Sequence, residues 1–429
     1  MEQLQSETKG VPVSDELRFR IATNLALCAL ILNEIDTARQ MFQAALVYQP
    51  DSPKALANGA LAALLGKQFQ QALDLSAKAR RISPRDSHAT AMHLEALYRL
   101  GHQAEIDRLI AEETWIEEDP ECTFSLGKIA FEGGNFSRAE SWLRASLRTG
   151  LEEFQTYELL AVAIIRPVQQ ALRDDPPLVE QFVGDAAGRL AEGEQLLTKS
   201  AACLDGCESR ELFHGVLANR ANVRGMLDRV EDAIKDCDRV LLEDETHDTA
   251  LHTKGLLLLQ SRRSSEAITC FERLSGQAER ASVVVPLARA YLNSGQPQRV
   301  IELLKPRWEL DALNPTRDID LAGLLAQAYT DTGRPADAES ILHTLIPTTP
   351  RDPEGLCLLS HLRYLQGRSK ESIELLQEAL TNAASVNQRN RILLQLANIH
   401  GAVGEWARAA EIYEAIVDSS HDILCCVDT

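Results

Sequence analysis

Small and large apolar residues recur along this chain at a nearly constant interval. An alanine returns at steps of 33 or 34 residues in the first third of the chain, with Ile106 in its place once, and a step of 34 recurs later. In residues 120–153, two apolar-periodic segments flank a break at residues 133–135, which predicts a pair of helices joined by a short turn. A period in this range indicates a repeat solenoid, in which each helical pair buries its apolar face against its neighbours. The alanines on this interval are Ala38, Ala72, Ala139, Ala233, Ala267, Ala338 and Ala409.

The residues around the recurring alanine identify the repeated unit. Gly127 lies twelve residues before Ala139, and Leu143 and Ser146 follow it. This pattern resembles the tetratricopeptide repeat (TPR), which has a small residue at position 8, alanine at position 20, a large apolar residue at position 24 and a small or apolar one at position 27. The resemblance covers about 400 of the 429 residues. It places the starts of the repeats at residues 19, 53, 87, 120, 214, 248, 281, 319, 353 and 390, with an irregular copy near 154.

Two further columns of the repeat support this alignment. Position 8 is small in ten of eleven copies, and position 24 is apolar in nine of ten. A large side chain at position 8 would push the two helices of a unit apart where they cross. The fold class that follows is all-α: a right-handed α-solenoid of about eleven helix–turn–helix TPR units.

The regular pattern is interrupted in the middle of the chain. We expect a flexible segment at 1–15, regular repeats at 16–153, an irregular extended repeat at 154–213, regular repeats at 214–423 and a short apolar tail at 424–429. In the irregular copy, Pro167 and residues 174–177 should interrupt the helix, and a long helical stretch should follow at 178–202. Two interpretations stay open: a tolerated insertion, or a protrusion that contacts a partner or bends the solenoid.

Composition excludes several classes of function. The net charge of −19, from 44 basic and 63 acidic residues, argues against a nucleic-acid partner. The chain has no Gly-rich phosphate loop, nucleophile elbow or paired-histidine zinc motif, so we expect no enzyme activity and no cofactor. Cys203 and Cys207 lack two further ligands, so no metal site is expected. No run of 18 apolar residues or signal peptide occurs, which predicts a cytoplasmic protein without membrane insertion.

The resemblance implies that an extended peptide binds along a concave surface lined by the first helix of each repeat. Side-chain amides on such a surface can donate and accept hydrogen bonds with a peptide backbone, and Arg289 would suit a carboxylate on the ligand. The lysine, asparagine and arginine positions by which some TPR relatives clamp a chaperone carboxy-terminus are not matched, since Ala218 stands at a lysine position, Thr253 at an asparagine position and Pro286 at the arginine position. The candidate ligand-binding residues are Asn24, Asn58, Asn219, Asn222, His252, Arg289, Gln327, His361 and Asn398.

Two hypotheses about function follow. The first is a non-catalytic scaffold for protein–protein interaction that binds a partner protein or an extended peptide segment. The alternative is a regulatory or substrate-recruiting portion of an enzyme or complex whose catalytic part, a transferase, protease or nuclease, lies on another chain or beyond residue 429. The apolar segment after the final repeat keeps a partner contact through the C-terminal face open, because a solenoid must cover its last apolar face.

Overall fold

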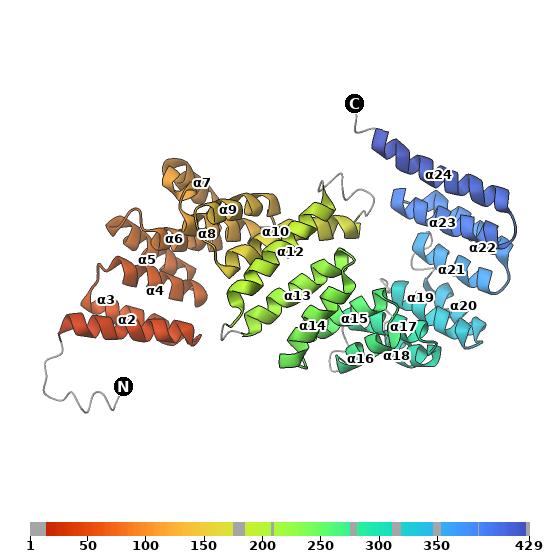
Figure 1. The fold of residues 1–429 in the computed structure, drawn as a ribbon, viewed down its shortest axis with the longest axis horizontal. Coiled ribbons are helices and arrows are strands. Elements are labelled where there is room, and N and C mark those ends of the chain that lie inside the picture. Colours follow the sequence, from red (N-terminus) through yellow and green to blue (C-terminus); the bar gives the residue numbers. More distant parts are fainter. Residues whose placement is uncertain are drawn as a thin grey trace. The chain divides into compact units, whose positions relative to one another are not determined.

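Helices account for nearly all of the described chain. The computed structural model describes residues 14–174, 185–206, 210–274, 281–310, 319–345, 353–384 and 386–425. Within these ranges the chain forms 22 α-helices and one 3₁₀ helix, and it contains no β-strand (Figure 1). The predicted all-α architecture of stacked helix pairs is confirmed. The chain divides into two compact units, Met1–Gln170 with Asp185–Val216, and Ala171–Gly184 with Leu217–Thr429.

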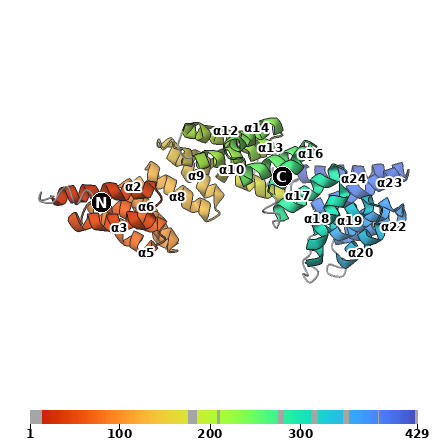
Figure 2. The same cartoon turned by 90° about the horizontal axis from the view of Figure 1, so that it is seen from below.

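Consecutive helices of each unit pack side by side as hairpin-like pairs (Figures 1 and 2). The first unit contains α2 (Asp15–Ile31), α3 (Ile35–Tyr48), α4 (Pro53–Leu65), α5 (Phe69–Ile82), α6 (Ser87–Arg99), α7 (Gln103–Glu112), the 3₁₀ helix η1 (Thr114–Glu117), α8 (Pro120–Glu132), α9 (Phe136–Arg148), most of α10 (Phe154–Asp174) and α12 (Ala186–Leu204).

The second unit begins within α13 (Arg210–Met226). It continues with α14 (Val230–Glu243), α15 (Asp248–Gln260), α16 (Ser264–Arg273), α17 (Ala281–Asn293), α18 (Pro297–Leu310), α19 (Ile319–Asp331), α20 (Pro335–Leu345), α21 (Pro353–Leu365), α22 (Ser369–Asn382), α23 (Val386–Ala402) and α24 (Trp406–Cys425). Helix α24 therefore includes the first two residues of the expected apolar tail, and residues 426–429 lie outside the described chain.

One residue reverses the chain between the two helices of every regular repeat. Position 15 has a positive φ in all ten, from Asn33 to Gly404, and it is a glycine in six of them. The amide of position 16 then donates to the carbonyl of position 11 at 2.8–2.9 Å, which is the Schellman arrangement that ends a helix. Lys67 and Arg262 adopt the same left-handed conformation, which costs about 1–2 kcal/mol for a residue with a Cβ atom. The packing of the two helices that flank each turn must therefore hold Lys67 and Arg262 in this conformation.

The two helices of a repeat cross most closely at position 8. All eleven position-8 residues are buried, and a Cβ atom built on Gly127 or Gly255 would lie 2.6 Å from Leu143 Cγ or Phe271 Cζ. Leu143 and Phe271 occupy position 24 of the same repeats. In the repeat starting at 353 the crossing is polar instead, because the buried Ser360 and Ser372 hydroxyls lie 2.8 Å apart and hydrogen bond to each other.

The irregular repeat corrects one prediction. The expected interruption at Pro167 is wrong, since α10 continues through this residue to Asp174. A proline inside a helix costs about 3 kcal/mol, but the burial of Ile164, Ile165 and Val168 around it offsets this cost, because each buried side chain contributes about 1.5–3 kcal/mol. Residues 175–184 lie outside the described chain, and α12 covers the described part of the predicted 178–202 stretch.

Helix α12 takes the place of a second helix for α10. A Cβ atom on Gly193 would lie 2.6 Å from the Ile165 side chain, and the Ser200 hydroxyl donates to the Phe154 carbonyl at 2.9 Å. Arg144 of α9 pairs with Glu192 of α12 at 2.7 Å. The extended repeat is thus packed like its neighbours.

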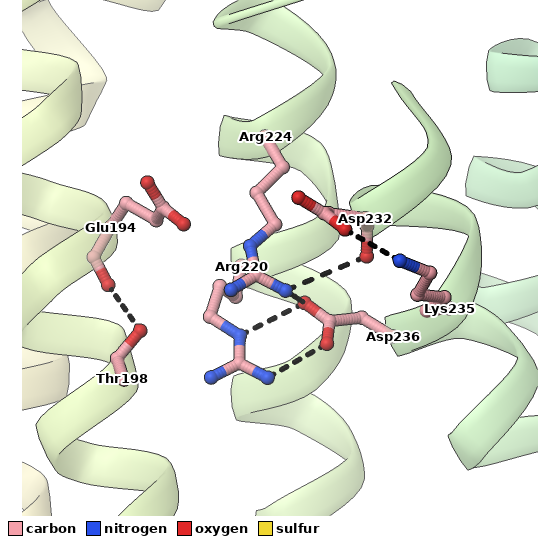
Figure 3. A network of polar contacts seen from close by, with 7 residues as sticks. All are labelled: Glu194, Thr198, Arg220, Arg224, Asp232, Lys235 and Asp236. Atoms are coloured by element: carbon pink, nitrogen blue, oxygen red, sulfur yellow. Dashed lines mark hydrogen bonds and ion pairs between the residues drawn. The ribbon is translucent and has the colours of Figure 1, made fainter. Parts of the chain in front are cut away.

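A buried ion pair joins α13 to α14 at the beginning of the second unit (Figure 3). Arg220 donates twice to the Asp236 carboxylate, at 2.9 and 2.7 Å, and Arg224 donates to it at 2.8 Å. Asp236 is 5% exposed. Loss of its charge would leave two largely buried guanidinium groups without this anion, which is a costly state.

None of the helices in the described ranges is long and apolar enough to cross a membrane.

The crossing at position 8 yields a stability prediction with a control of opposite sign. Gly255→Ala should lower the free energy of unfolding by about 1–2 kcal/mol, since overpacking costs about 1–3 kcal/mol and the better helix propensity of alanine returns only part of it. Gly215→Ala, on α13 with nothing within 4 Å of the added atom, should instead raise it by about 0.5–1 kcal/mol. Urea unfolding of the full chain followed by circular dichroism measures both. Equal effects would contradict the crossing geometry.

The buried ion pair yields a second prediction. Asp236→Asn should destabilise the chain by about 3 kcal/mol in the same urea assay, because it removes the anion of a buried pair. Asp232→Asn is the matched control, since Asp232 forms an exposed pair with Lys235 at 2.9 Å and should change stability little. A small effect of Asp236→Asn would show that the two arginines find other compensation.

Candidate functional site

All nine predicted ligand-binding residues lie on the first helix of their repeat, which we call helix A. Six of them are exposed, and Asn58, His252 and Gln327 are half-buried. They belong to α2 (Asn24), α4 (Asn58), α13 (Asn219, Asn222), α15 (His252), α17 (Arg289), α19 (Gln327), α21 (His361) and α23 (Asn398).

Asn222 and His252 come together in a depression of about 410 Å³ between α13 and α15. Met226, Leu256 and Leu257 supply apolar parts of its wall. Asn222 makes no hydrogen bond to any residue that the structure describes. The depression therefore combines a free amide with a surface suited to an apolar side chain.

A second depression of the same size on the second unit's helix-A surface surrounds Arg289. It has a volume of about 410 Å³ and is lined by residues of α17, α19, α21 and α23. Arg289 is exposed and forms no ion pair or hydrogen bond within the described ranges. Arg391, on the opposite wall, pairs with Glu354 at 2.9 Å, and Asp320 also lines the cavity. Arg289 is thus the cation here that is available for a ligand carboxylate.

Gln327 and His361 line a smaller depression of about 60 Å³ between α19 and α21. The Gln327 amide already donates to the Asp331 carboxylate at 2.7 Å. Although part of the His361 ring is exposed, the packing around it lowers its pKa below the usual value, and the nearby Asp331 carboxylate opposes this shift. A neutral imidazole can donate and accept one hydrogen bond each.

Several predicted residues are engaged within the protein. His252 Nε2 lies 3.0 Å from the Ser282 carbonyl, where α17 begins, and Asn398 accepts a hydrogen bond of 2.6 Å from the Tyr413 hydroxyl. Asn24 and Asn58 belong to the first unit. The structure therefore places Asn222, His252, Arg289, Gln327 and His361 in three depressions of one surface and leaves the other four outside them.

The sequence prediction missed Arg391, together with Gln388 and Gln395 in the same cavity. Arg391 stands at position 2 of its repeat, and the same position supplies Asp320 and Glu354. Comparing the residues at position 2 across the repeats would have found Asp320, Glu354 and Arg391.

Within the described ranges there is no group of three or more His, Cys, Asp or Glu residues that could hold a metal ion. Cys203 is exposed, and Cys207 lies outside these ranges. The expectation that no metal binds stays a prediction.

The chain consists of stacked helix pairs that cross closely at position 8, reverse through a left-handed residue at position 15 and leave one side of helix A exposed. These features define an α-solenoid repeat protein. Tetratricopeptide repeat family models match residues 23–87, 294–362 and 361–426. The chain belongs to the tetratricopeptide repeat family.

Among curated proteins, the chain is similar to anaphase-promoting complex subunit 7 of Dictyostelium discoideum. The two are 24% identical over 185 residues, which is 43% of this chain but only 30% of the relative's length.

Among solved structures, the chain resembles a tetratricopeptide repeat protein from Parabacteroides merdae, with 18% identity, a TM-score of 0.43 and coverage of 64% of this chain and 96% of that one. It also resembles yeast Tom70, with 14% identity, a TM-score of 0.39 and coverage of 94% and 100%.

Proposed function

We propose that this chain is a non-catalytic interaction scaffold, and that the helix-A surface of its second unit binds an extended segment of a partner protein. One observation supports this most directly: three depressions lie on helix A of neighbouring repeats and are lined by helix-A residues together with the residues that flank these helices. An extended peptide presents side chains and backbone groups at regular intervals, which matches such a series of sites. The sequence relative named above is itself a subunit of a multi-protein complex.

The chemistry of the depressions favours one kind of segment. The free Asn222 amide can hydrogen bond to a peptide backbone, and Leu256 beside it is 42% exposed and can pack against an apolar side chain. Arg289 can bind a carboxylate of the ligand through two parallel hydrogen bonds. We therefore expect a segment that carries at least one apolar and one acidic residue.

The test is selection from a displayed peptide library on the full chain, followed by affinity measurement of the selected peptides. Selected peptides should be enriched in acidic residues. The double variant Arg289→Ala with Asn222→Ala should weaken their binding by about 1–3 kcal/mol, as expected for lost charge-assisted and buried hydrogen bonds, with an almost unchanged melting temperature because both residues are exposed.

Arg148→Ala is the matched control, since Arg148 is an exposed arginine on the second helix of its repeat. It should leave peptide affinity unchanged. If binding survives the double variant but disappears when residues 154–207 or 423–427 are altered, the partner uses other parts of the solenoid and the proposed surface is wrong.

A further inference from the structure

Helix α2 carries its large apolar side chains on the outside. Its buried residues are Ala22, Ala26 and Ala29, and the last two pack with residues of α3 and α4. By contrast, Ile31 is 84% exposed and Leu27 is 38% exposed. Apart from the half-buried Phe19 and Leu30, α2 packs through alanine and buries little apolar surface of its own, so its other leucines and its isoleucines are left for another contact.

These exposed residues form a continuous seam. Leu17, Ile21, Leu25 and Leu32 are 48%, 46%, 37% and 68% exposed, and Cys28 between them is also exposed. Their spacings of four, four, three and four residues keep them on one side of the helix over its whole length. This is the spacing by which two helices pair along an apolar seam.

The seam is at the upper end of the apolar patches that monomeric proteins expose. Together with Leu27 and Ile31, it exposes on the order of 500–600 Å² of apolar residue surface per copy, whereas the largest patch on a typical monomer is about 300–600 Å² and is often functional. Two such faces together reach the roughly 1,000 Å² that a specific interface needs.

We propose that the α2 seam is the interface between two copies of this chain, with the two α2 helices antiparallel. The seam matches itself in that direction: Leu17 meets Leu32 of the second copy, Ile21 meets Cys28, and Leu25 lies at the two-fold axis. A two-fold contact requires this kind of self-complementary patch.

The local charge permits two copies to approach at α2. The whole chain carries a net charge of −19, which opposes self-association through most of its surface. Residues 14–33 contain two acidic residues, Asp15 and Glu16, and two basic ones, Arg18 and Arg20, so their net charge is zero. Glu16 and Arg20 pair with each other at 2.8 Å. A partner of strongly basic or acidic character finds no complementary surface here, whereas a second copy does.

Analytical ultracentrifugation of the full chain over micromolar concentrations tests the proposal. The unmodified chain should sediment as a dimer, and Ile21→Glu should make it a monomer with an unchanged circular dichroism spectrum. Leu242→Glu is the matched control, because Leu242 is 84% exposed on α14, and this variant should remain a dimer. A monomeric unmodified chain, or a dimer that survives Ile21→Glu, would overturn the proposal.

A cross-link tests the orientation independently of any loss of folding. In a Cys28→Ser background, Leu25→Cys should form a disulfide between two copies on oxidation, because residue 25 lies next to its own symmetry mate in the antiparallel pair. Leu242→Cys in the same background should form far less. Equal cross-linking of the two variants would show that the seam does not pair as proposed.

Discussion

The close crossing of the two helices within each repeat is the constraint on which the rest of the structure depends. A small residue at position 8 lets the position-24 side chain of the second helix fill the space beside it, as the 2.6 Å approach of Phe271 to a Cβ atom on Gly255 shows. With the helices this close, the chain must reverse within a few residues, and one left-handed residue at position 15 does this in every regular repeat. The same side of helix A is then left open in successive repeats. The candidate binding surface is a consequence of the crossing.

The residue types that this close crossing requires could be predicted from the sequence. Positions 8 and 20 could be read as columns of small residues because their environment is the same in every copy, and these residues are buried throughout the described repeats. The continuity of α10 through Pro167 could not be predicted from the sequence pattern. Pro167 is locally a helix breaker, and only the burial of Ile164, Ile165 and Val168 against neighbouring helices decides in favour of a continuous helix. A local rule failed where tertiary packing was stronger.

The candidate site was predictable in location but less so in detail. The repeat alignment placed all nine residues on helix A, but it could not show that Asn398 is bonded to Tyr413 or that His252 reaches the Ser282 carbonyl. Such contacts depend on side-chain conformations on two different helices. Arg391 was not predicted, because its place in the site depends on the cavity that it shares with Arg289.

Because each repeat contacts mainly its neighbours, the surfaces of this protein can be altered separately from its core. The stability of such an array is approximately the sum of the stabilities of its repeats and of the interfaces between neighbouring repeats. The short helix α7 buries only Ile106, and Ile116 of the following 3₁₀ helix supplies the missing apolar contact in the same cluster. The α2 seam residues and Arg289 lie outside such clusters and are exposed, although the Arg289 cavity is lined in part by Ile392, which belongs to a core cluster. Changes there can therefore alter association and ligand binding while the helix crossings that hold each repeat together stay intact.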